Sequence, residues 1–273
     1  MTLRKGVGLP TVGEFGDPAV LLELAVAAEE HGWDGVFLWD HLLYHDQSWP
    51  VANPTVTLGA IAAGTGRIRL GNLMTILPRR RAQTVAREAV TLDRLSGGRL
   101  VFGAALGSMD EEYAAFGEDP ALRTRAARLD ESLQVLTRLW SGGPVSYRGR
   151  YLTVDGVRMV PGPVQRPRIP VWCAGRWPGR AGFRRAARWD GAMPTFADYG
   201  RERAVPPEEL AAVVEFLRAE RGSLDGFDIV MQGWSPRQDP AVYAQVGLTW
   251  WIEAMGWWRG GVAEARERIA AGP

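Results

Sequence analysis

The sequence predicts one (β/α)8 barrel that spans residues 1–273, with insertions after the fourth strand and before the fifth. The length suits such a barrel, for which about 250 residues are typical. Strand-like and helical segments alternate about eight times, as in a parallel sheet that closes on itself. An open doubly wound sheet is the alternative, but it requires a glycine-rich nucleotide fingerprint after its first strand. Residues 9–13 (LPTVG) do not provide one.

The first half of the chain contains four strand–helix units. The first helix is expected to begin at Asp17-Pro18, an N-cap followed by a proline in the first turn, and to end at Gly32. Short β-rich runs predict strands at residues 7–9, 36–39, 68–74 and 100–103. Apolar side chains at helical spacing predict further helices around residues 54–63, 85–92 and 129–140.

The second half continues the alternation after an interruption. Strands are expected at residues 169–173, 191–193, 227–231 and 248–251, and helices over residues 180–187, 206–217, 241–246 and 262–270. Two segments break the pattern, namely a polar excursion at residues 110–123 and a hairpin with a proline-bounded loop at residues 144–167. Insertions that follow strands lie on the catalytic face of a barrel, so both segments are expected to form walls of a substrate site.

The charge balance argues against a nucleic-acid or membrane partner. The 32 basic and 31 acidic residues nearly cancel, whereas both of those partners require concentrated positive charge. Two arginine runs, Arg79 to Arg81 and Arg184-Arg185, are expected to be solvated surface.

Cysteine usage and hydropathy predict a cytoplasmic protein. Cys173 is the only cysteine, so no internal disulfide can form. The N-terminus shows no signal-peptide pattern, and no apolar stretch approaches the roughly 20 residues that a bilayer span requires.

His41 is the candidate catalytic residue. It follows the strand at residues 36–39 in the run Trp39-Asp40-His41, and functional side chains in barrels gather where strands end. A histidine there can donate or accept a proton near neutral pH. The alternative is a surface-loop histidine without a catalytic role. A metal site is not expected, because it needs more converging ligands than this segment offers.

A small-residue turn at Ala174-Gly175-Arg176 could bind a phosphate. It is expected to follow a strand and to open a helix, where backbone N–H groups and the helix dipole favour an anion. Arg125 could supply a counter-charge. The alternatives are an ordinary glycine turn and a helix-surface arginine. The 12 tryptophans suit walls around a planar ring system, although core packing or a dimer interface could equally account for them.

Several segments carry a resemblance to known proteins. The most specific is residues 86–100 (AREAVTLDRLSGGRL). The others are residues 27–41 (AAEEHGWDGVFLWDH), 65–71 (TGRIRLG), 77–81 (LPRRR), 162–172 (GPVQRPRIPVW) and 247–253 (GLTWWIE). Together, in order along nearly the whole chain, they resemble the luciferase-like monooxygenase family.

The resemblance implies a barrel that binds FMN, or the deazaflavin coenzyme F420, at the mouth formed by the carboxyl ends of the strands. His41 matches the active-site histidine of the family. Leu73-Met74 occupies the place of a non-prolyl cis peptide at a bulge under the flavin ring. Ala104 at the end of the fourth strand is a further cofactor contact, Ala174-Gly175-Arg176 corresponds to the phosphate turn, and Arg125 corresponds to an arginine that contacts the phosphate.

The resemblance predicts a flavin-dependent oxidoreductase, with the flavin performing the redox chemistry. A monooxygenase that uses reduced FMN and oxygen on a small organic substrate is the first expectation. F420-dependent hydride transfer and a flavin-binding barrel without turnover are the alternatives. Family members that oxidise sugar phosphates with F420 carry a glutamate where this chain has Ser108, which argues against that chemistry.

The expected partners are a small-molecule substrate, a second copy of the chain and a separate flavin reductase. The dimer contact is expected on the helices after the second and third strands, including the face with Val85, Ala89 and Leu92.

Overall fold

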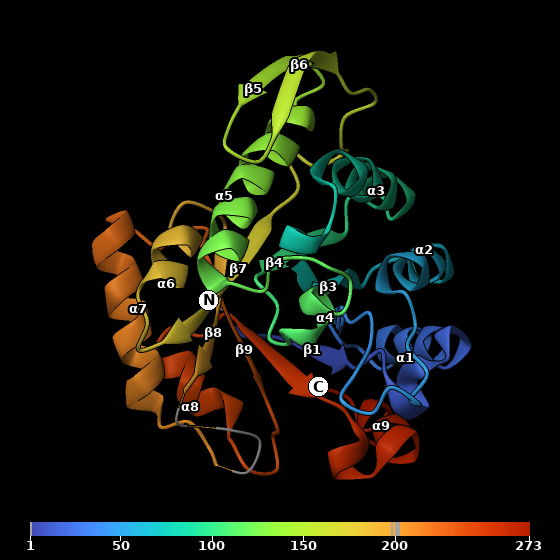
Figure 1. Cartoon of the computed structure of the whole chain (residues 1–273). Helices are drawn as coiled ribbons and strands as arrows, with labels where there is room; N and C mark the ends of the chain where they lie inside the picture. Colours follow the sequence, from blue (N-terminus) through green and yellow to red (C-terminus); the bar gives the residue numbers. More distant parts are fainter. Residues whose placement is uncertain (1, 198, 200–202) are drawn as a thin grey trace.

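A closed barrel of parallel strands forms the centre of the molecule. The computed structural model describes residues 2–197, 199 and 203–273. Within them, eight strands follow one another around the barrel in the order β1, β10, β9, β8, β7, β4, β3, β2 (Figure 1). Their bounds are β1 (Arg4–Leu9), β2 (Gly35–Leu38), β3 (Arg69–Ile76), β4 (Leu100–Ala105), β7 (Val171–Trp177), β8 (Gly191–Phe196), β9 (Asp228–Gly233) and β10 (Trp250–Ala254). The predicted barrel is confirmed.

Helices cover the outside of the barrel. The helices that alternate with the strands are α1 (Pro18–Glu30), α2 (Pro54–Gly64), α3 (Ala82–Leu95), α5 (Leu122–Leu139), α6 (Ala181–Ala186), α7 (Pro207–Arg221), α8 (Pro240–Gln245) and α9 (Gly261–Ala270). Asp17 caps α1 as predicted, since its side chain accepts a hydrogen bond from the Ala19 N–H at 2.8 Å. No helix in the described residues is both long enough and apolar enough to span a membrane.

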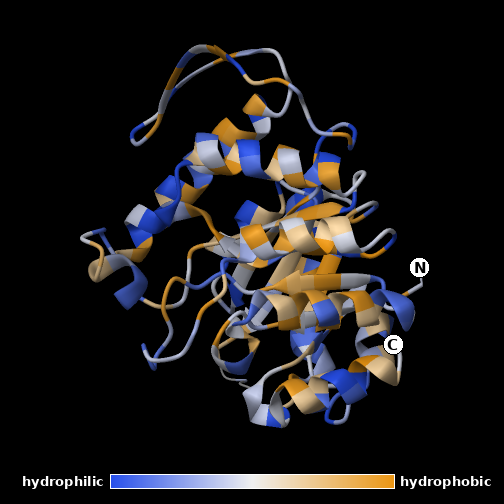
Figure 2. Cartoon of the chain, turned by 90° about the vertical axis from the view of Figure 1, so that its right-hand side faces the viewer, coloured by the Kyte–Doolittle hydropathy of each residue, from blue (hydrophilic) through white to orange (hydrophobic). Residues whose placement is uncertain are grey.

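The apolar core has two layers, one inside the barrel and one between strands and helices. Three rings fill the interior, with centroids 5.6 Å apart for Phe37–Trp172 and Trp172–Trp250 and 5.7 Å apart for Phe37–Trp250. Glycines make room for these rings, because a Cβ on Gly191 would lie 2.4 Å from Cδ1 of Trp172. Figure 2 shows the strands of the barrel in the orange of apolar residues. Each large side chain buried in this way contributes about 1.5–3 kcal/mol.

The two predicted insertions lie at opposite ends of the barrel. The segment after β4 contains a short helix, α4 (Glu111–Ala114), and lies at the mouth, as expected. The second insertion forms the predicted hairpin, β5 (Pro144–Arg148) with β6 (Thr153–Arg158), but it follows α5 and precedes β7. Because α5 runs from the mouth back to the amino ends of the strands, a segment after α5 cannot line the mouth.

Contacts of the hairpin confirm that it packs outside the barrel. The Glu131 carboxylate on α5 accepts backbone hydrogen bonds from Arg150, Tyr151 and Leu152 at 2.8–3.0 Å, and the hairpin extends beyond the end of α5 (Figure 1). The prediction that residues 144–167 form a substrate wall is therefore wrong.

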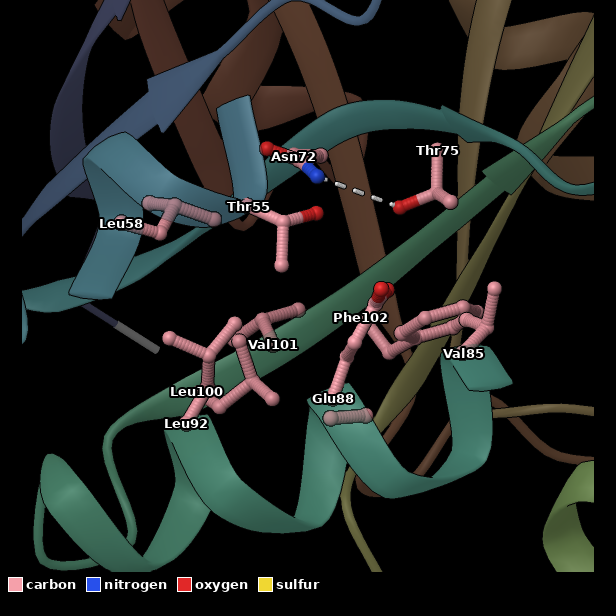
Figure 3. A pocket seen from close by; sticks show the side chains of 11 residues that line it. Thr55, Leu58, Asn72, Thr75, Val85, Glu88, Leu92, Leu100, Val101 and Phe102 are labelled. Atoms are coloured by element: carbon pink, nitrogen blue, oxygen red, sulfur yellow. Dashed lines mark hydrogen bonds between the residues drawn. The ribbon is translucent and has the colours of Figure 1, made fainter. Parts of the chain in front are cut away.

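The face of α3 expected to contact a second copy points inward instead. Val85, Ala89 and Leu92 are 4%, 3% and 8% exposed and belong to the core. Figure 3 shows Val85 and Leu92 beside a cavity of about 20 Å³ between α2, α3 and the strands β3 and β4. The volume suffices for one water molecule. Apolar spacing identified the buried face of this helix correctly, but the surface that covers this face is the barrel.

Candidate active site at the mouth of the barrel

Small side chains occupy the inward positions nearest the mouth. Ala105 of β4 and Ala174 of β7 pack on the interior cluster, the buried side chains around Phe37, Trp172 and Trp250, on the side of the mouth. Gly8 of β1 has no room for a side chain, because a Cβ there would lie 2.9 Å from Nε2 of Gln232. Gly8 lets Gln232 and Ile252 pack against β1, whereas Ala105 and Ala174 place only methyl groups above the interior rings. These small inward residues would support a flat group placed over the rings.

The bulge in β3 carries a cis peptide bond between Leu73 and Met74. The pairing of β3 with β4 shifts register between Asn72 and Thr75, and both bulge residues face the barrel interior. Gly103 lies opposite, where a Cβ would be only 2.1 Å from the Asn72 carbonyl oxygen. The cis peptide implied by the resemblance is confirmed at the expected residues, and its contact with a cofactor stays a prediction.

His41 lies beside the mouth and is held by a buried carboxylate. Its Nδ1 is 3.3 Å from Oε1 of Glu112, and its side chain is 14% exposed. Glu112 lies on α4 and also accepts a 2.6 Å hydrogen bond from the Leu42 N–H. A carboxylate only accepts, so the proton of the His41–Glu112 bond is on Nδ1. Nε2 is therefore the atom of His41 that can exchange a proton with a substrate.

Two arginines complete a buried ion network behind His41. Arg79 lies 2.7 Å from Oε2 of Glu112 and 3.0 Å from Oδ1 of Asp40. Arg80 also pairs with Asp40, at 2.7 Å. The prediction of solvated arginines is wrong for Arg79 and Arg80, whose side chains are 2% and 17% exposed, and is confirmed for Arg81, which is exposed. The second predicted run is also only partly at the surface, because Arg185 is buried against Asp130.

The network lowers the pKa of both carboxyl groups. Burial alone raises the pKa of Asp40, but the charges of Arg80 and Arg79 and hydrogen bonds from Arg80 and the Ile76 N–H bring it below its usual value. Burial likewise raises the pKa of Glu112, and the hydrogen bond from His41, the charge of Arg79 and the Leu42 N–H outweigh that effect. Both groups are therefore ionised at neutral pH.

Ala104 faces away from the mouth. Its side chain is fully buried in the outer core between the strands and the helices. Successive side chains of a strand point to opposite faces, so the next residue, Ala105, is the one that faces the interior. The side chain of Ala104 therefore cannot contact a cofactor in the mouth, and Ala105 is the residue of this pair that faces the mouth.

Residues Ala174, Gly175 and Arg176 form the end of a strand rather than a turn. They pair with Met193, Pro194 and Thr195 of β8, and β7 continues to Trp177. Ala174 faces the interior, and Arg176, two residues further along the strand, lies on the same side and is exposed. Gly175 points outward, where a Cβ would lie 2.8 Å from Cε1 of Phe183 on α6. The glycine therefore permits close packing of α6 on the strand.

This packing predicts that Gly175→Val lowers stability. We expect a loss of about 1–3 kcal/mol in the free energy of unfolding, because added bulk in a packed core forces neighbouring side chains to move. Urea denaturation of the two proteins measures the loss. Phe183→Ala should cost less in the Gly175→Val background than in the wild type, because the clash partner is then removed. Additive effects of the two changes would show that Gly175 does not clash with Phe183.

Arg125 is buried and already has an acidic partner. Its Nη2 lies 2.6 Å from Oδ1 of Asp110, and its Nη1 donates to the Gly107 carbonyl at 3.2 Å. The guanidinium also lies over the Tyr113 ring, 4.8 Å from the centroid. Arg125 thus holds the segment after β4 in place. Its role at a phosphate stays a prediction.

Aromatic side chains gather on the side of the mouth that includes His41. The aromatic cluster comprises Trp39, His41, Tyr44, Trp49, Trp257 and Trp258. Its members come from the segments after β2 and β10, which flank β1 in the barrel. The rings of Trp39 and Trp258 are stacked, 5.8 Å apart and 11° from parallel. This side of the mouth is therefore apolar and ring-lined.

Sequence reasoning missed several residues of this site, among them Glu112, Tyr44, Trp257 and Trp258. Glu112 stands in the acidic run Asp110 to Glu112, which has no feature that distinguishes a buried carboxylate from solvated ones. Trp257 and Trp258 follow the last strand by a few residues. Their place just beyond the end of a strand is the signal that could have found these two, because functional side chains of a barrel gather there.

The mouth fits the flat ring system of a flavin or deazaflavin. Glycine or alanine stands at the inward positions Gly8, Gly103, Ala105 and Ala174, above the interior rings. The Leu73–Met74 bulge lies at the same level on β3, and His41 stands at the edge. Arg176 is the exposed cation on this face of β7 and could meet a phosphate.

Among curated proteins, the chain is similar to F420-dependent glucose-6-phosphate dehydrogenases. It is 32% identical over 213 residues to the enzyme of Gordonia bronchialis, covering 73% of this chain and 60% of that protein. It is 36% identical over 166 residues to the enzyme of Nakamurella multipartita, covering 58% and 46%. The chain thus matches about half to three fifths of the length of these relatives.

Solved structures with the same fold use either cofactor. An F420-dependent secondary alcohol dehydrogenase in complex with an F420-acetone adduct has a TM-score of 0.78 at 20% identity, with 93% of each chain covered. The oxygenating constituent of 3,6-diketocamphane monooxygenase from Pseudomonas putida, in complex with FMN, has a TM-score of 0.71 at 15% identity, with 86% of this chain and 67% of that chain covered. The family model for luciferase-like monooxygenases matches residues 3–245. The chain therefore belongs to the luciferase-like monooxygenase family.

Proposed function

We propose that the protein is an F420-dependent oxidoreductase that interconverts a small organic alcohol and its carbonyl form at the barrel mouth. The observation that carries the proposal is His41, held by Glu112 at the same end of the barrel as the Leu73–Met74 cis peptide and the small inward residues Ala105 and Ala174. Similarity to F420-dependent dehydrogenases over 73% of the chain favours the deazaflavin. The proposed order of cofactors is therefore the reverse of the order expected from the sequence, which placed FMN first.

The residues of the chain would bind and orient the reactants and handle one proton. The deazaflavin, when bound, supplies the hydride acceptor. Nε2 of His41 would accept the proton of the alcohol oxygen when the alcohol carbon gives up its hydride, and it would return that proton in the reverse direction. Glu112 keeps the His41 proton on Nδ1 and stabilises the imidazolium that forms. The small inward residues and the β3 bulge would support the ring.

Equilibrium titration of the purified chain with F420, FMN and riboflavin tests the cofactor. We expect F420 to bind more tightly than FMN, followed by reduction of bound F420 when a suitable alcohol is added. Tighter binding of FMN, with oxygen-dependent reoxidation of its reduced form, would instead support the second candidate, an FMN monooxygenase supplied by a separate flavin reductase. The FMN-bound neighbour of the same fold favours that candidate. Cofactor binding without any turnover would leave a flavin-binding barrel.

A second copy of the chain is the proposed partner, and α2 is the proposed contact. This helix has no charged residue, and Val56 on it is 73% exposed. Ala60 is exposed on the same helix, and Gly59 has open space around its Cα. Figure 2 views the molecule from the side of α1, α2 and α3 and shows α2 without the blue of hydrophilic residues. A charge-free outer surface of this kind is typical of an interface core.

We expect light scattering to give about twice the 30.0 kDa mass of one chain. Ala60→Glu should shift the protein toward the monomer, because it buries an unpaired charge in the contact. Ala263→Glu, at an exposed alanine on α9, is the matched control and should leave the mass unchanged. A wild type that stays at 30.0 kDa at micromolar concentration would contradict the dimer.

A further inference from the structure

We infer that the aromatic cluster binds an uncharged, ring-bearing part of the substrate, and that this site does not accept a sugar phosphate. The inference deepens the proposed function and rests on it for the position of the cofactor. It departs from the relatives named above, whose names specify glucose 6-phosphate.

The proton-handling histidine is surrounded by rings. The centroid of His41 is 5.1 Å from that of Tyr44 and 6.0 Å from that of Trp39. Trp257 packs against both of these residues, since its ring centroid is 5.5 Å from that of Tyr44 and 6.2 Å from that of Trp39. A substrate oxygen that reaches Nε2 of His41 must therefore lie beside aromatic carbon. Edge-to-face and offset contacts with such rings favour another aromatic group.

The support beneath the cluster is also apolar. Val12 and Met109 are buried with Tyr44, and Trp49, Leu43 and Val51 pack against them. Leu42, next to His41, is 49% exposed. An apolar group placed here would cover exposed carbon surface and gain about 25 cal/mol for each Å² removed from water.

Within the described part of the chain, Arg79 and Arg259, which flank the cluster, already have acidic partners. Arg79 pairs with Asp40 and Glu112, and these carboxylates are 0% and 1% exposed. On the β10 side, Arg259 lies 2.7 Å from both Glu253 and Glu264. Since both of these arginines are already paired, a phosphate dianion beside His41 would lose its water without gaining an unpaired cation from either of them, which disfavours binding.

The exposed Arg176 lies elsewhere on the mouth. It belongs to β7, which β4 and β3 separate from β2, the strand that leads to Trp39 and His41. Its charge is suited to an anionic group of the cofactor on that side. The mouth thus divides into a cationic side on β7 and an aromatic side over β2, β1 and β10.

Calorimetric titration of the full chain, with and without bound oxidised F420, tests the inference with three probes. Acetophenone carries a ring and a carbonyl, acetone carries the carbonyl alone, and glucose 6-phosphate carries the charge. We expect acetophenone to bind at least about tenfold more tightly than the other two. Trp49→Leu should weaken acetophenone binding by roughly two- to tenfold, the range expected from loss of one aromatic contact. Trp49→Phe keeps a ring and should largely restore binding.

Trp189→Leu is the matched control, since Trp189 is half-buried but precedes β8 at the opposite end of the barrel. Its acetophenone affinity should equal that of the wild type. Two results would overturn the inference: glucose 6-phosphate that binds as tightly as acetophenone, or equal losses of acetophenone affinity in Trp49→Leu and Trp189→Leu. If F420 still binds in that case, the proposed function is unaffected. Failure of F420 to bind, with the acetophenone preference and the Trp49 effect preserved, would overturn the proposed function and support the inference.

Discussion

Replacement of His41 by alanine is expected to lower turnover by about 10²–10⁴-fold, the usual contribution of a positioned acid or base. The structure leaves Nε2 of His41 for the substrate proton, because Nδ1 is bonded to Glu112. The affinity for F420 should change little, since a proton-transfer group acts mainly in the transition state. Steady-state kinetics and cofactor titration of the same preparation give both quantities.

His45→Ala is the matched control for this prediction. His45 stands four residues further along the same segment and is exposed, and the hydrogen bonds that Glu112 accepts come from His41, Leu42 and Leu43. Its loss should leave kcat within about twofold of the wild type, as for a surface change. Normal turnover in His41→Ala would reduce this histidine to a residue that positions its loop.

Glu112→Gln separates orientation from proton transfer. Glutamine can still accept hydrogen bonds from Leu42 and His41 but removes the buried negative charge. We expect a fall in kcat smaller than that of His41→Ala, with little change in KM, because Glu112 acts only through His41. A larger loss than that of His41→Ala would show that Glu112 has a separate role.

The second large effect concerns stability. Asp40→Asn should lower the free energy of unfolding by about 3–5 kcal/mol, the range for removing one partner of a buried ion pair. Asp40 is 3% exposed and compensates the charges of Arg79 and Arg80. Its carboxylate also accepts a 2.8 Å hydrogen bond from the Ile76 N–H. Urea denaturation at neutral pH measures the difference.

Glu23→Gln is the control for a surface pair of similar length. Glu23 lies 2.7 Å from Arg266, but the two side chains are 53% and 50% exposed. Water screens such a pair, so its loss should cost less than about 1 kcal/mol. Equal effects of Asp40→Asn and Glu23→Gln would mean that burial of Asp40 adds nothing to the strength of its pairs.

The effect of Asp40 should also depend on pH in one direction. Its folded-state pKa is lowered, so the carboxylate contributes stability that is fully present above its unfolded pKa of about 3.9. That contribution is lost as pH falls through the folded pKa. The difference between the wild type and Asp40→Asn should be constant from pH 7 to about pH 5 and should shrink in more acidic solution.

The sequence by itself determined the alternation of barrel strands and helices and the buried face of α3. Period-two and helical spacings are local properties, so the strand at residues 68–74 and the apolar face of Val85, Ala89 and Leu92 could be identified without any contact. Capping is local too, which is why Asp17-Pro18 located the start of α1. The place of the cis peptide at Leu73-Met74 came from the resemblance.

Only the tertiary structure decided which side chains meet. His41 and Glu112 are 71 residues apart, and Arg79 and Asp40 are 39 apart, so no local pattern could pair them. The same holds for Gly175, whose outward neighbour Phe183 is supplied by α6. Spacing shows that a helix face is apolar, and the residue type shows that an arginine is charged. Which partner covers that face or neutralises that charge depends on how the barrel closes. That closure buried the arginines assigned to the surface and turned the α3 face assigned to a dimer toward the strands.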